Sequence, residues 1–517
     1  MTRLTRRTLL RLAGPFVAAA TVPPHVRAAA RLQQPATPAE TAADVPVSDV
    51  MIRLSTYMSR ARAQALPDDV TERAKRHVLD TLAAMVSGSD LAPGRAALAF
   101  ARAYGGKPVS TVVADTLLCG PIEAALVNGT MAHADETDDT LAPGPWHPGC
   151  NVVPAALALG EQFAISGTHF LRAVVLGYDI GTRVMAAIQP GMANSHKLSY
   201  GIGGVFGAAA AGGAVASFDA QKMRWLLSYT AQQSSGIESF PRDPDHIEKG
   251  FIFGGMPARS GVTSVLLVHS GWTAVNDIMA GPDNFIVANA PTGKADLLVD
   301  RLGERYYILN ANIKKWTVGQ PIHAPLDAVE ALLQKRTIDV NQIQEVVVRY
   351  QPGSITDNSG PSDINVQHAL AMMLIDKTLT FRSIHDKARM QDPAVLRLKQ
   401  KVRLDPGPPG AGGAAAAGAG GTRPPLVRIT LADGTRLEQD SVGAGVLGTA
   451  ANPMSRDQVI AKCRDLMAPV LGDAQTRRLI DRVMTIDTAK DVRELRPLLQ
   501  RANTNGTPKL SEYPNAK

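Results

Sequence analysis

A short acidic segment between two apolar segments constrains the fold of this chain more than any other feature. It reads MAHADETDDTLAPGPWHP over residues 131–148. Its titratable side chains are those of His133, Asp135, Glu136, Asp138, Asp139 and His147. Carboxylates this close raise one another's pKa, so they must be solvated, paired with cations or held in a cleft at shifted pKa values.

The flanking segments favour a cleft over a solvated surface. Residues 122–131 are mostly apolar and helical in character, and residues 150–160 are apolar on nearly every face, which is typical of a core helix. An acidic run near the end of a helix is usually a solvated surface. Because both neighbours are predicted to be buried here, we interpret residues 131–148 as part of a functional cleft.

Several motifs of the chain resemble those of the MmgE/PrpD family, which includes 2-methylcitrate dehydratase, cis-aconitate decarboxylase and iminodisuccinate epimerase. The first motifs lie in the acidic segment, where AHADETDDT and His147-Pro148-Gly149 are similar to the family pattern. The others are VPAAL at 153–157, GVFGAAAA at 204–211, Glu248-Lys249, GMPARSG at 255–261, KKW at 314–316 and Asn452-Pro453. The resemblance covers about residues 47–498. It departs at Glu136, where the family usually has Asp, and at Thr137, which replaces an aromatic residue.

The resemblance implies a mostly α fold, in which both chain ends build a large all-helical domain and a smaller α+β domain forms a lid. Composition changes along the chain agree with this division. We predict a helical domain at 46–302, an α+β domain at 303–440 and the C-terminal part of the helical domain at 441–517. A Gly/Ala/Pro-rich insert at 406–421 is expected inside the α+β domain.

Local patterns predict individual elements. Apolar residues recur at helical spacing after Asp68, which is predicted to cap a helix that runs to Val86. Residues 198–218 carry no formal charge and many glycines, so we expect a buried helix preceded by a glycine-rich loop. The remaining predicted elements are a strand at 344–351, helices at 323–335 and 363–377, a hairpin around Asp433-Gly434, and helices from Ser455 onward.

The N-terminal residues have the pattern of a twin-arginine export signal. TRRTLLR at residues 5–11 combines a hydroxyl residue, two arginines, an apolar pair and a basic residue. An uncharged segment at 12–24 is shorter than the roughly 20 residues that span a bilayer, and Val26-Arg27-Ala28 is a candidate cleavage site. We therefore predict a signal peptide at 1–28, a flexible linker at 29–45 and a periplasmic protein with no stable membrane span after cleavage. A retained anchor and a disordered basic tail are the alternatives.

Charge and cysteine content argue against two classes of protein. The formal net charge is +7, of which five charges come from arginines of the predicted signal peptide, so +2 remains on the mature chain. A nucleic-acid partner would require a clustered basic face, and a mature charge near +2 does not suggest one. The three scattered cysteines, Cys119, Cys150 and Cys463, argue against a disulfide framework. The family resemblance implies a homodimer.

The resemblance also implies small di- or tricarboxylate substrates and a proton removed or replaced at a carbon beside a carboxylate. Such a step requires cations, a base of near-neutral pKa and an acid for the leaving group. His147 is the first candidate for the general acid/base, because imidazole titrates nearest neutrality, and Glu136 is an orienting partner or substrate contact. Lys249 and Lys314 are the candidate ammonium groups. The alternatives are a packing role for His147 and an exposed ion pair with Glu248 for Lys249.

A second set of residues is predicted to contact the substrate. Its members are His133, Asp138, Asp139, Thr140, His196, Tyr200, Arg259 and Lys315. Several alternatives stay open. Asp138 and Asp139 could instead be acceptors for helix N-termini, and Arg259 could cap a helix. Lys315 could take the place of Lys314, and either His196 or Tyr200 could serve where other family members have a histidine.

The first functional hypothesis is a cofactor-independent lyase, in particular a hydro-lyase similar to 2-methylcitrate dehydratase. A decarboxylase or an epimerase on the same scaffold is the alternative, because the three reactions differ in what leaves. A metallohydrolase is a different class, for which the acidic segment offers His133, Asp135, Asp138, Asp139 and His147 without a recognised ligand motif. A periplasmic carboxylate-binding protein without catalysis is the third class. No metal and no cofactor are expected for the lyase.

Overall fold

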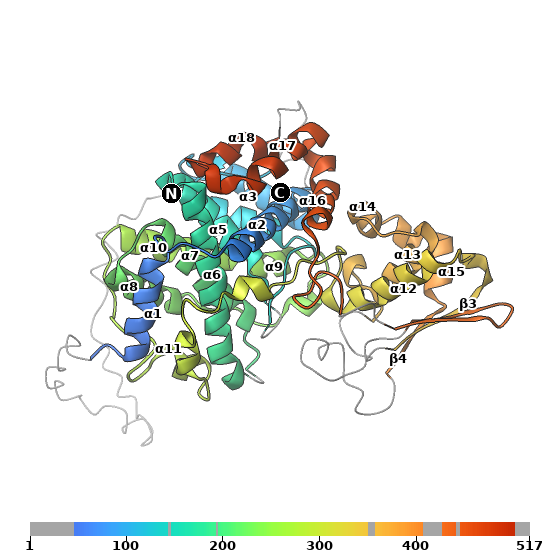
Figure 1. Ribbon diagram of the computed structural model, residues 1–517, viewed down its shortest axis with the longest axis horizontal. Helices are drawn as coiled ribbons and strands as arrows, with labels where there is room; N and C mark the ends of the chain where they lie inside the picture. Colours follow the sequence, from blue (N-terminus) through green and yellow to red (C-terminus); the bar gives the residue numbers. More distant parts are fainter. Residues whose placement is uncertain are drawn as a thin grey trace, which may run out of the picture. The chain divides into compact units, whose positions relative to one another are not determined.

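Helices make up most of the described chain, as the sequence predicts (Figure 1). The computed structural model describes residues 46–142, 146–192, 195–349, 357–406, 427–440 and 445–501. The predicted signal peptide at 1–28, the linker at 29–45 and nearly all of the insert at 406–421 lie outside these residues, so they stay predictions.

Helices from both ends of the sequence share one apolar core. The N-terminal series is α1(Asp49–Arg60), α2(Asp68–Gly88), α3(Ala92–Tyr104), α4(Pro121–Ala132), α5(Gly149–Phe163), α6(Gly167–Ile188), α7(Ser199–Val215), α8(Ala220–Gln232) and α11(Phe285–Asn289), with a short hairpin of β1(Ser110–Thr111) and β2(Leu118–Cys119). The C-terminal series is α16(Arg456–Leu471), α17(Asp473–Met484) and α18(Arg496–Leu499). α2 packs against both α16 and α17, and the core includes buried residues of both series.

The helices α5, α6 and α7 approach one another so closely that glycine is required at their contacts. A Cβ at Gly177 of α6 would lie 2.8 Å from the carbonyl oxygen of Gly207 in α7, and a Cβ at Gly207 would lie 3.0 Å from the carbonyl oxygen of Gly177. The predicted buried helix is confirmed, but the glycine-rich loop before it is wrong. α7 begins at Ser199, so the glycines of this region lie inside the helix. Close packing here overrides the low helix propensity of glycine.

The predicted helix start at Ser455 is confirmed, whereas the cap predicted at Asp68 is wrong. Ser455 caps α16, and its hydroxyl and the side chain of Gln458 form a reciprocal capping box. α2 begins at Asp68, but Pro67 is its N-cap residue and no side chain caps it. Asp68 therefore lies in the first turn, where a carboxylate is favourable because of the helix dipole. α2 also continues through Gly88, beyond the predicted end at Val86.

A second apolar core is built from residues between Trp316 and Leu437. Its helices are α12(His323–Lys335), α13(Val366–Asp376), α14(Phe381–His385) and α15(Pro393–Lys399). Its sheet has the order β4-β3-β5-β6 and consists of β4(Val402–Asp405), β3(Ile343–Arg349), β5(Val427–Leu431) and β6(Arg436–Gln439). β3 pairs parallel with β4 and antiparallel with β5. The predicted strand, helices and hairpin are confirmed, whereas the domain limits at 303 and 440 stay predictions.

One further helical segment crosses the first core and includes a wider turn. It consists of α9(Ile247–Gly250), the π-helical turn η5(Phe251–Gly255) and α10(Met256–His269). By length and composition it could cross a membrane, but 72% of its most apolar window is buried inside the protein, as in a core helix. A Cβ at Gly254 would lie 2.1 Å from the carbonyl oxygen of Gly129 in α4, so η5 and α4 are in backbone contact.

Candidate active site

The acidic segment forms a buried loop between α4 and α5. Backbone hydrogen bonds hold its middle, from the Thr140 amide to the Asn312 carbonyl at 3.1 Å and from the Asn312 amide to the Thr140 carbonyl at 2.7 Å. All the carboxylates of the segment are buried. Because a buried carboxylate is costly without partners, each one has to be matched by a donor or a cation. The loop is therefore not a solvated surface.

Asp139 anchors this loop to three helices. Its Oδ2 accepts hydrogen bonds from the Tyr178 hydroxyl at 2.6 Å and lies 2.7 Å from Nδ1 of His77. Its Oδ1 accepts from the backbone amide of Gly149, the first residue of α5, at 2.8 Å. The structure thus places Asp139 among α2, α5 and α6, where it has the contacts of an acceptor for a helix N-terminus.

Asp138 lies between two imidazole rings. Nδ1 of His133 is 3.0 Å from Oδ2 of Asp138, and Nδ1 of His147 is 3.0 Å from Oδ1. Burial alone would raise the pKa of Asp138, but the two imidazoles hold it well below its usual range. Burial lowers the pKa of His133 to about 4, against the opposing effect of Asp138. An ionised Asp138 that receives two N–H groups directs the Nε2 atoms of both rings away from itself.

Glu136 bridges two ammonium groups. Its Oε1 pairs with Nζ of Lys249, and its Oε2 lies 3.0 Å from Nζ of Lys314. Nζ of Lys314 also donates to the Glu136 carbonyl at 3.0 Å and lies 3.9 Å from Oδ1 of Asp138. Burial would raise the pKa of Glu136, but the two lysines lower it well below its usual range. Burial would lower the pKa of Lys314, but Glu136 and Asp138 raise it, so the charged network is self-consistent.

The segment that carries Lys249 also supplies an aromatic wall. The ring of Phe253 in η5 stacks on His133, with centroids 4.6 Å apart and planes 5° apart. Nζ of Lys249 lies 5.4 Å from the centroids of both Phe253 and Phe240, within the range of a cation–π contact. The wider turn also directs the Phe253 carbonyl to Asn151 Nδ2 of α5 at 3.5 Å. The π-helical turn therefore ties Lys249 to the start of α5, which follows His147.

Two side chains from the second core reach the acidic loop. Oδ2 of Asp363 accepts a hydrogen bond from the Glu136 amide at 3.2 Å. Nε2 of His385 lies 3.3 Å from Oδ2 of Asp135, within ion-pair distance but not aligned for a hydrogen bond. Burial raises the pKa of Asp135 to about 6 and also raises that of Asp363. Both cores thus contribute to the surroundings of Glu136.

The remaining predicted site residues are not gathered around Glu136 to the same degree. Lys315 pairs with Glu330 and lies over the Trp316 ring, so of the two neighbouring lysines it is Lys314 that contacts Glu136. Thr140 Oγ1 donates to Gln320 Oε1 at 3.4 Å, and the centroid of the Tyr200 ring lies 5.6 Å from that of Phe253. His196 is exposed, and the Arg259 guanidinium donates to the neighbouring Ser260 Oγ at 3.5 Å.

The buried cluster offers two sets of potential metal ligands. His133, Asp138 and His147 form one set and His133, Glu136 and His246 the other, with ligand atoms within 4.8 Å of one another in each. However, the carboxylates of both sets already have partners, since Glu136 pairs with two ammonium groups and Asp138 with two imidazoles. A divalent cation there would also be repelled by the two lysines. This set of donors fits an ammonium–carboxylate network better than a metal centre.

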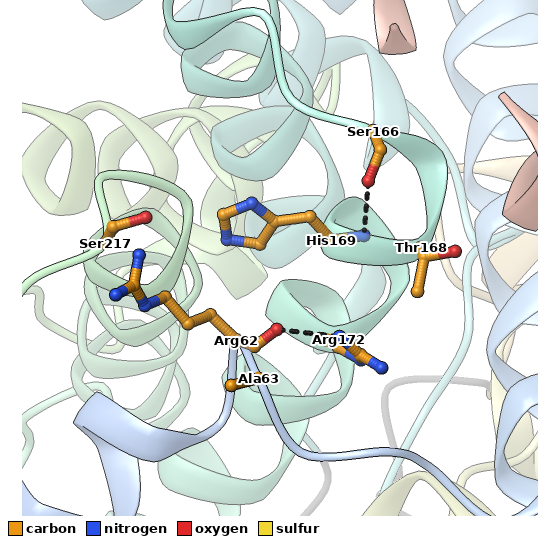
Figure 2. Close-up of a pocket in the computed structure, with 7 residues that line it drawn as sticks. All are labelled: Arg62, Ala63, Ser166, Thr168, His169, Arg172 and Ser217. Carbon is orange, nitrogen blue, oxygen red and sulfur yellow. Dashed lines mark hydrogen bonds between the residues drawn. The ribbon is translucent and has the colours of Figure 1, made fainter. Parts of the chain in front are cut away.

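A hollow of about 330 Å³ lies elsewhere, at the start of α6 (Figure 2). Its lining consists of Arg62, Ala63, Ser166, Thr168, His169, Arg172 and Ser217. α5 begins beside Asp139 and ends just before this hollow. A helix of that length extends about 22 Å. The hollow therefore contributes no residue to the cluster around Glu136.

Four residues close to the cluster escaped the sequence analysis. His77 could have been found, because it lies on the apolar face of the predicted helix after Asp68. His246 stands three residues before Lys249, in a motif whose resemblance to the family lies in the lysine. Asp363 and His385 have no local signal, because they lie more than 200 positions away from the acidic segment and belong to the second core.

Comparisons with known proteins cover both cores. Residues 52–297 match the MmgE/PrpD N-terminal domain, and residues 316–486 match the MmgE/PrpD C-terminal domain. A cis-aconitate decarboxylase of Aspergillus terreus is 24% identical over 494 residues, which cover 87% of this chain and 96% of the relative. The cis-aconitate decarboxylase of Mus musculus is 23% identical, over 84% of this chain and 90% of the relative. That of Homo sapiens is 24% identical, over 66% of this chain and 73% of the relative.

Proposed function

Because the chain belongs to the MmgE/PrpD family, we propose that it is a cofactor-independent lyase that acts on a small di- or tricarboxylate. The observation that carries this proposal is the buried network in which Glu136 bridges Lys249 and Lys314 beside the Asp138–imidazole cluster. Such a network combines ammonium groups for substrate carboxylates with an imidazole for proton transfer. These are the components that chemistry at a carbon beside a carboxylate requires.

The two lysines are proposed to bind substrate carboxylates. In the free protein their charges are matched by Glu136, and Lys314 is further compensated by Asp138. A substrate carboxylate that approaches Lys249 replaces part of this pairing and keeps the ammonium group compensated. The lysines then stabilise the negative charge that develops on the substrate in the transition state, where a preorganised ammonium group is most effective.

His147 is proposed to be the general acid/base. Asp138 fixes its Nδ1, so Nε2 is the nitrogen that exchanges a proton with the substrate. In a decarboxylation, the bond from carbon to the departing carboxylate breaks, carbon dioxide leaves, and Nε2–H of the imidazolium protonates the carbon. In a dehydration, neutral Nε2 removes the proton from carbon, and the resulting imidazolium delivers this proton to the hydroxyl group, which leaves as water while the carbon–carbon double bond forms.

Decarboxylation and dehydration are the two specific candidates. The relatives that cover most of the chain are cis-aconitate decarboxylases, which favours decarboxylation of a tricarboxylate as the first candidate. Dehydration stays the second candidate, because the family that the acidic segment resembles also includes 2-methylcitrate dehydratase. Both begin from the same arrangement of lysines and imidazole, and so does an epimerisation, in which the proton returns to the other face of the carbon.

The proposal is tested by NMR in D₂O with a panel of di- and tricarboxylates that includes cis-aconitate and 2-methylcitrate. Wild-type protein should release carbon dioxide or water, or incorporate deuterium beside a carboxylate. His147→Gln should lower turnover by about 10²-fold or more, and Lys249→Ala should chiefly raise KM. Lys315→Ala is the matched lysine control, because Lys315 pairs with Glu330. Unchanged kinetics in both the His147 and the Lys249 variants would contradict the assignment.

Two further experiments separate the other classes of function. A lyase of this kind keeps its turnover after exhaustive treatment with a chelator, whereas a metallohydrolase loses it. A carboxylate-binding protein without catalysis shows ligand affinity but no turnover in any variant. Binding calorimetry alongside the NMR assay therefore distinguishes all three classes.

We also propose export by the twin-arginine route and a homodimeric state. The first rests on the motif at residues 5–11, and replacement of Arg6 and Arg7 by lysine should retain the protein in the cytoplasm. The second rests on the family resemblance, and light scattering of the purified protein at a monomer mass would contradict it.

A further inference from the structure

We propose that His246 is a specificity-determining residue that contacts the substrate through Nε2 and selects tricarboxylates over dicarboxylates. This inference rests on the proposed function, because it assigns a further group to the same site. Lys249 and Lys314 supply two ammonium groups for two carboxylates. His246 would supply the donor for a third.

The imidazole of His246 is buried without a hydrogen-bond partner at Nε2. The residue is 8% exposed, and Nε2 has no partner among the described residues. A buried polar atom that lacks a partner costs about 1–3 kcal/mol, so such atoms in a folded protein require an explanation. Nε2 of His133 is buried and unpartnered in the same way. Two neighbouring imidazoles with free nitrogens indicate a common external partner.

The position of His246 connects it to the proposed catalytic groups. Its ring centroid lies 5.4 Å from that of His133. Ring nitrogens of His246 and His133 and an oxygen of Glu136 all lie within 4.8 Å of one another. A small anion held by Lys249, which follows in the first turn of α9, is therefore within reach of His246.

The backbone at His246 is held in an unfavourable conformation. Its φ of 62° is in the left-handed region, and His246 is the residue that precedes α9. For a residue other than glycine such a conformation costs about 1–3 kcal/mol and is typical of functional sites. The helical residues that follow place Lys249 against Glu136. The left-handed conformation thus lets His246 and Lys249 approach the same small region.

The charge state of His246 suits a hydrogen-bond donor. Burial lowers its pKa well below the usual range, and Lys249 and His133 lower it further, against Glu136 and Asp138. The imidazole is therefore neutral at physiological pH, and it carries one N–H group without having to be protonated. A site built to donate a hydrogen bond to a substrate oxygen rejects an analogue without that oxygen, because the donor is then left unpaired.

Binding calorimetry with two matched ligands tests the inference. Propane-1,2,3-tricarboxylate and glutarate share one carbon chain and differ only in the middle carboxylate. His246→Asn shortens the side chain but tolerates the left-handed backbone. We expect it to weaken the binding of propane-1,2,3-tricarboxylate by about 10- to 100-fold, the usual scale for a hydrogen bond to a charged group. The affinity for glutarate should change by less than about threefold, because glutarate lacks the carboxylate that would accept the hydrogen bond from His246.

Two further variants distinguish a contact from a structural role. His246→Gln carries a neutral donor close to the position of Nε2 and should restore the affinity for the tricarboxylate to within a few-fold. His368→Asn is the matched control, because His368 on α13 is also buried with an unpartnered Nε2 but belongs to the second core. It should leave both affinities unchanged.

The outcomes separate this inference from the proposed function. The role of His246 alone would be overturned if His246→Asn lost the same affinity for both ligands or lost affinity for neither. It would also be overturned if His246→Gln did not restore the affinity for the tricarboxylate. If the wild-type protein binds neither ligand and turns over no carboxylate, the proposed function falls as well. Should His246→Asn fail to fold, the Nε2 resonance of ¹⁵N-labelled His246 in wild-type protein decides, since it must shift with the tricarboxylate and not with glutarate.

Discussion

Glu136→Gln should destabilise the protein because it leaves two buried ammonium groups without their main counter-charge. The side chain of Lys314 is 0% exposed and that of Lys249 is 8% exposed, so water does not replace the lost carboxylate. Removing one member of a buried ion pair typically costs about 3–5 kcal/mol. Lys314 keeps Asp138 at 3.9 Å, which favours the lower part of this range. We therefore expect a loss of about 3–4 kcal/mol in the free energy of unfolding at pH 7.

The stability that Glu136→Gln loses depends on pH, and the pKa shifts of Glu136 and Lys314 set the sign of this dependence. The folded-state pKa of Glu136 lies well below the ordinary value of 4.5, so its contribution is present above pH 4.5 and disappears as the pH falls through the lowered value. The pKa of Lys314 is raised above 10.5, so its contribution is present below that value and is lost as the pH rises further. The difference between wild type and variant should thus be largest near neutrality and shrink in acid.

Urea unfolding at pH 7 and at pH 3, followed by circular dichroism, measures this difference. Glu304→Gln is the matched control, because Glu304 forms an exposed pair with Arg301 at 3.3 Å. That change should cost less than about 1 kcal/mol. Adding Lys314→Met to Glu136→Gln should recover part of the lost stability, since it removes a stranded charge. Equal stability of Glu136→Gln and wild type at pH 7, with no effect of the second change, would refute the reasoning.

Three other substitutions test separate features. Asp139→Asn should lower stability by about 1.5–3 kcal/mol, the scale of hydrogen bonds to a charged group, and leave KM unchanged; a large change in KM in a stable variant would argue for substrate contact. The free energy of unfolding of Asp135→Asn relative to wild type should rise by up to about 3 kcal/mol between pH 4 and pH 8 in urea titrations. The reason is that the pKa near 6 makes ionisation of Asp135 in the folded wild-type protein unfavourable. A difference in stability that stays constant with pH would contradict that pKa. Gly177→Ala should cost about 1–3 kcal/mol by overpacking, whereas Gly360→Ala, with no atom within 4 Å of the new Cβ, should not.

The sequence predicts the helical fold because local signals and burial agree along most of it. Apolar segments on both sides of the acidic run become α4 and α5, and the hairpin at Asp433-Gly434 is present with Gly434 at a φ of 82°. The failures occur where tertiary packing overrides local preference. The glycines of α7 favour a loop on their own but lie inside a helix, because the segments packed around α7, among them α5, α6, α8 and α10, leave little space for side chains there.

The candidate site was predictable in its residue types and only partly in its geometry. Motif resemblance selected Glu136, Lys249 and Lys314, and these three side chains meet in the structure. The sequence could not decide between Lys314 and Lys315, since neighbouring side chains point in different directions only after the backbone is placed. Asp363 interacts with a backbone amide of the acidic loop, and such a contact leaves no pattern in a sequence.

The π-helical turn η5 sets the rotational phase of Lys249 relative to α10. Each residue of an α-helix advances the chain by about 100° and 1.5 Å, and a π turn accommodates one additional residue within an otherwise regular helix. Deleting a single residue among Phe251–Gly255 would straighten this stretch and swing α9 around its axis by roughly a quarter-turn. The ammonium group would then face away from Glu136, although every residue type of the cluster would still be present. Counting residues from Lys249 to Gly255 as if they formed an ordinary α-helix would therefore misplace this lysine in any homologue that keeps the π turn.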